Sequence, residues 1–305
     1  MNQTLVRRSR PRHGLSQTLS PTPGRTLLRA TVAQFLRPAS VAAGHTAAPV
    51  STRIAVGNLP CDVAFSPNSG TAYVLNTVTQ SISVIDVVAG VVTGTMVLRE
   101  HPRTIAVSRC GTIAYVTEPN RNSVAVISLA TGALLEPIAV GRFPHTVTLS
   151  PSGSIAYVSN SGDNTVSVVD VAAHRVIGVA ISVGEEPHDV AFSPDGTLAY
   201  VSNFREGTVS VIDVGARRVS SSMVLEGECA SGIAFTSDGA KAYVAHNRDN
   251  VSVITVASGT VDAVITVGSG ACGIAGGADG GTVFVTNQND GTVSVIDVAT
   301  DTISA

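Results

Sequence analysis

Six times along this chain an aromatic residue followed by valine returns at a nearly fixed interval. The aromatic positions are Tyr73, Tyr115, Tyr157, Tyr200, Tyr243 and Phe284, so the successive spacings are 42, 42, 43, 43 and 41 residues. Each pair is followed by a short polar turn and then by a run close to TVSVID. A fixed period of this length is typical of a repeat architecture, in which each repeat is one supersecondary unit. The period constrains the fold more than any single motif does.

One repeat, residues 185–225, shows how the unit folds. Its β-branched runs predict four short strands, at 189–193, 198–202, 208–214 and 218–225. Pro, Asp, Asn and Gly between the runs predict tight turns, so the four strands form one antiparallel blade. Val, Ile and Ala occupy both faces of this blade, and neither face can be left in water.

Neighbouring blades must therefore cover both faces, which predicts an all-β fold, a β-propeller of six four-stranded blades. After Asp297 only eight residues remain, whereas 12 separate Asp86 from the end of its blade at Leu98. The missing four are matched by residues 53–56, so we expect this N-terminal strand to pair with residues 292–298 and close the ring. The alternative is seven blades, with a degenerate N-terminal repeat.

Three runs carry a resemblance to a known family: YVSNSGDNTVSVVD (157–170), YVSNFREGTVSVID (200–213) and FVTNQNDGTVSVID (284–297). They resemble the YVTN-repeat β-propeller family, over residues 52–305. The resemblance implies a surface-layer or exported type of propeller. Related propellers include lactonases, lyases and proteins with haem or copper sites, and many have seven blades.

Residues 1–50 differ from the rest of the chain in charge. They contain seven arginines and no acid, whereas the remainder has 12 Lys and Arg against 22 Asp and Glu, a net charge of −10. We interpret residues 1–50 as a basic leader or disordered tail, rich in Ser, Pro and Ala, and residues 51–305 as the propeller. The segment is consistent with an export or transit signal. It is also consistent with a decayed repeat, because residues 20–44 share several positions with residues 66–90.

Charge and hydropathy exclude several kinds of partner. The acidic body has a single lysine and offers no cluster of cations to a phosphate backbone, so we expect no nucleic-acid partner. Its apolar runs are only strand-length, and we expect no transmembrane segment. We expect a monomer whose partner is a protein or a small-molecule ligand. An exported or cell-surface location is slightly favoured over the cytoplasm.

Candidate functional residues are those that break the repeat at one shared location. Asp and Asn recur at equivalent strand ends in four repeats, and we interpret both sets as turn caps. The loop entering each first strand differs between repeats, and we call the residues at its second-last position before the apolar strand the ring residues. They are Cys61, Arg103, His145, His188, Ser231 and Cys272. Asp62, Asp189, Glu118 and His246 lie near the same predicted channel mouth and complete the candidate ligand-binding set.

The ring residues support two functions. Our first interpretation is a non-enzymatic scaffold that binds a protein partner or small ligand at the channel mouth. The alternative is a lyase or lactone hydrolase, in which Arg103 holds an anion and His145 or His188 acts as acid or base. We expect no cofactor. A metal ion held by His145 and His188 is the alternative, but no ligand spacing supports one. Cys61 and Cys272 could pair as a disulfide or remain two small buried residues.

Overall fold

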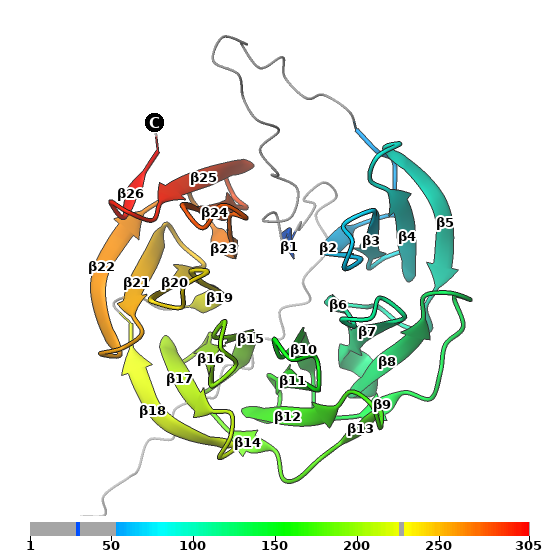
Figure 1. Ribbon diagram of the computed structural model, residues 1–305, viewed down its shortest axis with the longest axis horizontal. Helices are drawn as coiled ribbons and strands as arrows, with labels where there is room; N and C mark the ends of the chain where they lie inside the picture. The colour runs from blue at the N-terminus through cyan, green and yellow to red at the C-terminus, as the bar shows by residue number, and fades with distance from the viewer. Residues whose placement is uncertain (1–28, 31–52, 226–228, 305) are drawn as a thin grey trace, which may run out of the picture.

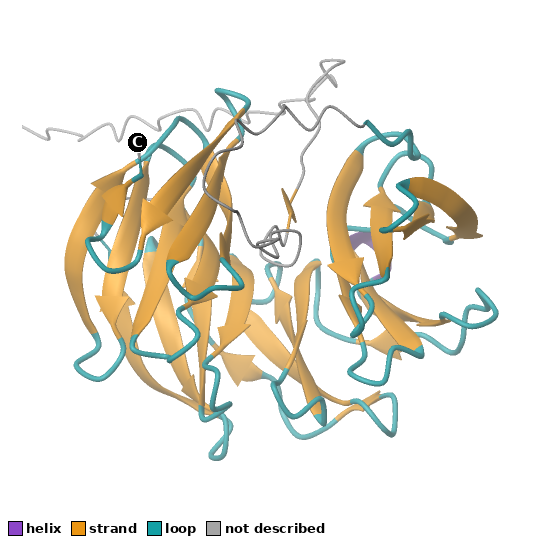
Figure 2. Ribbon diagram, turned by 45° about the horizontal axis from the view of Figure 1, so that its top comes forward, coloured by secondary structure: helices purple, strands orange, loops and turns teal. Residues whose placement is uncertain are grey.

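A computed structural model describes residues 29–30, 53–225 and 229–304 of the chain. Within these residues the fold is all-β: six antiparallel blades stand in a ring around a central channel (Figure 1). Their strands stack side by side around the channel and their loops lie at its two faces (Figure 2). The predicted fold class is confirmed. One short 3-10 helix, η2 (Pro119–Arg121), is the only helix among the described residues, and no helix there is long and apolar enough to cross a bilayer.

We number the blades 1 to 6 in chain order, and within each blade the strands follow one another outward from the channel. The innermost strands are β2 (Pro60–Phe65), β6 (Ile105–Val107), β10 (Pro144–Leu149), β15 (Pro187–Phe192), β19 (Ala230–Phe235) and β23 (Ala271–Gly276). The second strands are β3 (Thr71–Asn76), β7 (Ile113–Glu118), β11 (Ile155–Asn160), β16 (Leu198–Asn203), β20 (Lys241–His246) and β24 (Thr282–Asn287). The third strands are β4 (Ser81–Asp86), β8 (Ser123–Ser128), β12 (Thr165–Asp170), β17 (Thr208–Asp213), β21 (Asn250–Thr255) and β25 (Thr292–Asp297).

The outermost strands vary in length. Blades 1, 4 and 5 have seven-residue strands, which are β5 (Val91–Val97), β18 (Arg218–Val224) and β22 (Thr260–Thr266). Blades 2 and 6 end in the two-residue strands β9 (Ile138–Ala139) and β26 (Thr302–Ile303). In blade 3 the strand is divided into β13 (Arg175–Val176) and β14 (Ile181–Ser182), which both pair with β12. In blade 4 every observed strand agrees with its predicted range within two residues.

The hydrophobic core is divided into layers between adjacent blades. Tyr115, Tyr157, Tyr200 and Tyr243 are at most 1% exposed, and each packs against the blade that follows its own. Small residues such as Ala156 and Val158 of blade 3 face Tyr115 of blade 2. Burial of these layers holds the ring together, because a blade alone would expose both of its apolar faces.

The residues that follow the tyrosines link the blades. Ser159 accepts a hydrogen bond from the Thr146 amide of its own blade (3.0 Å) and donates to the His188 carbonyl of the next (2.7 Å). Thr117 makes the same pair of bonds, with the Thr104 amide (3.0 Å) and the His145 carbonyl (3.2 Å). The hydroxyl residue of the repeat therefore fixes the backbone at the start of the next blade.

The recurrent Asn and Asp residues have different tasks. Asp170 accepts hydrogen bonds from the amides of Ala172 and Ala173 at 3.0 and 2.9 Å, so the predicted turn cap is confirmed. The amide nitrogen of Asn160 instead donates to hydroxyl groups of the third strand, at Thr165 (3.0 Å) and Ser167 (2.9 Å). The structure therefore corrects the predicted turn cap at the Asn positions, since these side chains are buried between strands.

Residues 53–56 do not close the ring in the way predicted. They form no strand, and Ile54 and Val56 pack on the face of blade 1 that points away from blade 2. The third strand of the last blade, β25, pairs with β24 and with β26. The physical reason is that the first and last blades are not adjacent: β1 (Arg29–Ala30) pairs in parallel with β2 and also contacts β23 (Figure 1). The remaining residues of the predicted leader lie outside the described part of the chain.

Candidate functional site

Five of the six ring residues, all except Arg103, lie at β-bulges of the first strands. In blade 3 the first strand pairs Pro144 with Asn160 and resumes only at Val147, so His145 and Thr146 lie in a register shift. The same shift occurs in blades 1, 4, 5 and 6. A bulge redirects side chains that would otherwise alternate across a strand. The residue two positions before the ring residue has a positive φ in these five blades, for example 50° at Phe143, which turns the chain into the bulge.

All six ring residues line one cavity at the channel mouth, as the repeat pattern predicts. Its volume is about 390 Å³, and each blade contributes one ring residue. Further lining comes from the loops, including Leu59, Pro102, Pro119 and Phe204 as apolar surface and Asn120, Asn247 and Gln288 as amides. A concave site with mostly apolar walls and a few convergent polar groups is typical of small-molecule pockets.

One wall of this cavity is a continuous row of four side chains from blades 2, 3 and 4. The guanidinium of Arg103 hydrogen-bonds Nε2 of His145. The imidazole of His145 stacks on that of His188, with ring centroids 4.0 Å apart and an interplanar angle of 17°. His188 in turn stacks on Phe204 at 4.1 Å and 17°. The row thus runs from a cation through two imidazoles to an aromatic ring.

His145 has polar neighbours at both ring nitrogens. A guanidinium only donates, so Nε2 is the acceptor in the contact with Arg103. Nδ1 lies 3.3 Å from the hydroxyl of Thr146. The side chain of His145 is buried, and its charged neighbour is the Arg103 cation. The side chain of His188 is partly exposed, and its Nε2 lies 3.9 Å from the carboxylate of Glu186. The two imidazoles therefore have different electrostatic surroundings.

The ring contains two cysteines, Cys61 and Cys272, from blades 1 and 6. Burial raises the pKa of the Cys61 thiol to about 11, and its Sγ lies within donating distance of the carbonyl oxygens of Arg103 (3.4 Å) and Leu75 (3.6 Å). Cys272 lies 3.6 Å from the hydroxyl of Thr286. Both are free thiols. In the described part of the chain, no three His, Cys, Asp or Glu side chains are grouped to hold a metal ion.

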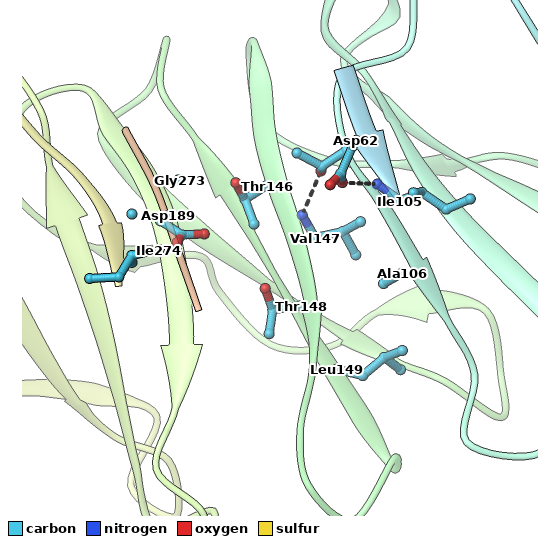
Figure 3. Close-up of a pocket in the computed structure, with 12 residues that line it drawn as sticks. Asp62, Ile105, Ala106, Thr146, Val147, Thr148, Leu149, Asp189, Gly273 and Ile274 are labelled. Atoms are coloured by element: carbon cyan, nitrogen blue, oxygen red, sulfur yellow. Dashed lines mark hydrogen bonds between the residues drawn. The ribbon is translucent and has the colours of Figure 1, made fainter. Parts of the chain in front are cut away.

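The predicted site residues Asp62 and Asp189 lie one step deeper than the ring, in the wall of the channel. Together with threonines and glycines of the first strands they line a second cavity of about 230 Å³ (Figure 3). Asp62 accepts the amide of Ile105 in the next blade at 2.9 Å, and Asp189 accepts that of Ile233 at 2.9 Å. Both carboxylates therefore link adjacent blades.

Glu118 and His246, also predicted for the mouth, occupy the position that Asn has in the other blades. Glu118 is 3% exposed and accepts a hydrogen bond from Ser123 at 2.7 Å. His246 is 1% exposed, and its Nε2 is 2.8 Å from the hydroxyl of Ser252. Neither side chain lines the mouth cavity.

Sequence reasoning missed His101, which lines the mouth cavity beside Arg103. Its Nδ1 is 3.0 Å from the carbonyl of Thr77, and its Nε2 is 3.4 Å from the side-chain nitrogen of Gln80. The signal was present two residues before the ring, where each blade again has a different residue. Leu59 has the same position in blade 1 as His101 in blade 2, and it lines the same cavity.

Comparisons with known proteins agree on the architecture. A family model described as lactonase, seven-bladed β-propeller, matches residues 39–220 and 144–304. A hydrazine synthase structure from Kuenenia stuttgartiensis is 19% identical with a TM-score of 0.59, over 79% of this chain and 96% of the other. A functionally unknown protein from Desulfotomaculum acetoxidans is 15% identical with a TM-score of 0.71, over 82% and 86%. At these identities the two structures indicate the fold alone. No curated protein matches.

Proposed function

Because the chain belongs to the lactonase family of seven-bladed β-propellers, we propose that its channel mouth binds a small organic anion, a carboxylate with an apolar part. The observation that carries this proposal is the row of Arg103, His145, His188 and Phe204 along one wall of the mouth cavity. Cation, imidazole and aromatic ring stand in that order. A ligand with a charged end and a flat apolar end would meet complementary groups along the row.

The charged end of the ligand belongs at Arg103. A guanidinium presents a planar fork of N–H donors that matches a carboxylate in two parallel hydrogen bonds. The surrounding body has a net negative charge, so an anion is attracted to this place by the arginine and not by the general field. His145 keeps the guanidinium at the mouth by accepting its hydrogen bond.

The apolar end belongs at Phe204 and the proline and leucine side chains of the rim. A cavity of about 390 Å³ suits a small molecule and is too small for a folded partner. Aromatic rings favour offset stacking on other flat groups. Planar carboxylates should therefore bind more tightly than aliphatic ones of the same size.

Lactone hydrolysis is a second candidate function, favoured by the pair of imidazoles beside the arginine. His188 would take a proton from water as the water adds to the lactone carbonyl, and the ring C–O bond would then break, with the proton passing to the departing oxygen. The product is a hydroxy acid, whose new carboxylate is the anion that Arg103 would hold. Family membership supports the reaction class, while the assignment of His188 rests on its position in the row.

The repeats support the narrower proposal that this is a YVTN-type propeller. Three positions of that motif have separate tasks in the blades: Tyr157 packs on the next blade, Ser159 bonds to it, and Asn160 bonds to the third strand. These tasks concern assembly. They leave the ring residues free to differ between blades, which is the pattern that a binding site in a repeat protein requires.

The test is a binding and turnover screen on the purified full chain. The probes are benzoate, butyrate, 4-hydroxybutyrate, γ-butyrolactone and dihydrocoumarin, with affinity measured by isothermal titration and hydrolysis by pH-stat. We expect Arg103→Ala to weaken binding of the tightest carboxylate at least tenfold. Arg142→Ala is the matched control, because Arg142 is exposed and pairs with Asp163. Unchanged affinity in Arg103→Ala would contradict the proposed site. Hydrolysis that survives His188→Ala would contradict the second candidate alone.

A further inference from the structure

A third cavity lies at the loops of blades 3 and 4 and shares one wall with the mouth cavity. Its volume is about 740 Å³, and we call it the outer cavity. Arg103, His145 and His188 line both cavities. A ligand whose carboxylate is bound by Arg103 can therefore extend along the two imidazoles into the outer cavity.

Two carboxylates of blade 4, those of Glu185 and Glu186, line the outer cavity. Glu185 has a cation beside it, because its carboxylate lies 3.7 Å from Nε of Arg205. The carboxylate of Glu186 instead has the imidazole of His188 beside it, with Nε2 at 3.9 Å. An ordinary imidazole is mostly neutral above about pH 7, so it offsets the charge of a carboxylate only in part. Glu186 therefore gives the outer cavity an anionic group next to the row.

The backbone of Glu186 is held by two blades. Its φ of 55° belongs to the turn that enters the bulge of blade 4. Its amide donates to Oδ1 of Asn164 in blade 3 at 2.9 Å, and its carbonyl accepts the amide of Phe204 at 3.0 Å. The equivalent residues of the other blades are Leu59, His101, Phe143, Cys229 and Gly270, and none of them is an acid. The anionic group is thus specific to the blade that supplies His188 and Phe204.

We propose that the ligand of the row is an amino carboxylate, whose carboxylate is bound by Arg103 and whose ammonium group is bound by Glu186. Arg103 contacts one imidazole of the stacked pair and Glu186 contacts the other. The two charges of the ligand are therefore joined by a short spacer, which packs along the imidazoles. This inference rests on the proposed function, since it requires the carboxylate to be bound by Arg103.

Charge favours such a zwitterion over a simple anion. A carboxylate bound beside the row is repelled by Glu186 and by the net negative charge of the propeller body. An ammonium group next to Glu186 removes the first repulsion and adds an ion pair. The side chain of Glu186 is 44% exposed, and ion pairs of exposed groups are weak. We therefore expect the ammonium group to tighten binding by about threefold or more.

The test compares matched ligands by isothermal titration of the full chain at pH 8, where an alkyl ammonium is charged and an ordinary imidazole is neutral. Each amino carboxylate is paired with the carboxylate that has a methyl group in place of the ammonium. The pairs are 4-aminobutyrate with pentanoate, and 4-(aminomethyl)benzoate with 4-ethylbenzoate. We expect the amine of at least one pair to bind about threefold more tightly or better.

Two variants assign this preference to one carboxylate. Glu186→Gln should abolish it, while its Tm stays that of wild type, because the exchange keeps the size of an exposed side chain. Glu185→Gln is the matched control and should retain the preference, since Glu185 already lies beside Arg205.

The other outcomes separate this inference from the proposed function. Equal affinities within both pairs, or a preference that survives Glu186→Gln, would overturn the amino-carboxylate ligand. If the methyl ligands then still lose affinity in Arg103→Ala, the proposed function stands without this inference. Affinities that Arg103→Ala leaves unchanged, or no binding of any of the four ligands, would overturn both.

Discussion

Asp62→Ala should destabilise the propeller without affecting the mouth. Asp62 is 8% exposed, and its carboxylate accepts a hydrogen bond from the Val63 amide of its own blade at 2.9 Å. It accepts a second from the Ile105 amide of the next blade at 2.9 Å (Figure 3). Alanine leaves both amide donors in the channel wall without this acceptor. Hydrogen bonds to a charged group contribute about 1.5–3 kcal/mol each, and partial access of channel water reduces the loss. We therefore expect a decrease of about 3 kcal/mol in the free energy of unfolding.

That loss corresponds to a decrease in Tm of about 6–10 °C for a domain of this size. Differential scanning calorimetry measures it, and Asp86→Ala is the control. Asp86 accepts two amide hydrogen bonds in an exposed turn, so its loss should cost only about 1 kcal/mol. A Tm for Asp62→Ala within 1 °C of wild type would refute the reasoning. So would an unchanged Tm accompanied by lost carboxylate binding, because Asp62 would then be a ligand-binding residue.

Three further predictions concern the repeat and an exposed thiol. Gly141→Ala should destabilise the fold by about 1–3 kcal/mol in urea unfolding, since an added Cβ would lie 2.6 Å from Cγ of the buried Asn160; an unchanged midpoint would contradict this. Thr117→Val should lower Tm and also weaken carboxylate binding, because it removes the hydroxyl that donates to the backbone carbonyl of His145. A lower Tm with full affinity would contradict the second part. The pKa of Cys110 is lowered to about 7 by hydroxyl hydrogen bonds, so its alkylation by iodoacetamide should reach half its maximal rate near pH 7. Cys61 is partly buried and its pKa is raised to about 11, so it should react much more slowly; equal rates would contradict both statements.

The repeat period was sufficient to predict the blades, because each blade buries the same positions. Equivalence between repeats accounts for three features: the buried tyrosines between blades, the turn at Asp170, and the meeting of the ring residues in one cavity. The ring residues differ between repeats but have equivalent positions, so equivalence also predicted that they meet at the channel mouth.

Other features depend on geometry that a period does not contain. Stacking of His145 on His188 requires the bulges that redirect both side chains, and no residue type marks a bulge here. Glu118 and His246 vary between repeats as ring residues do, yet they point into blades. Counting residues at the two chain ends could not tell whether residues 53–56 complete blade 6 or belong beside blade 1, since both arrangements need the same length.

The most direct measurement of the central claim is an NMR titration of the histidine side chains with the tightest carboxylate of the screen. We predict that the imidazole resonances of His145 and His188 shift together and saturate at the affinity found by calorimetry. His174 should remain unmoved, because it lies beside Tyr115, away from the mouth cavity. Saturable binding that leaves the resonances of both His145 and His188 in place would contradict a ligand site at the channel mouth.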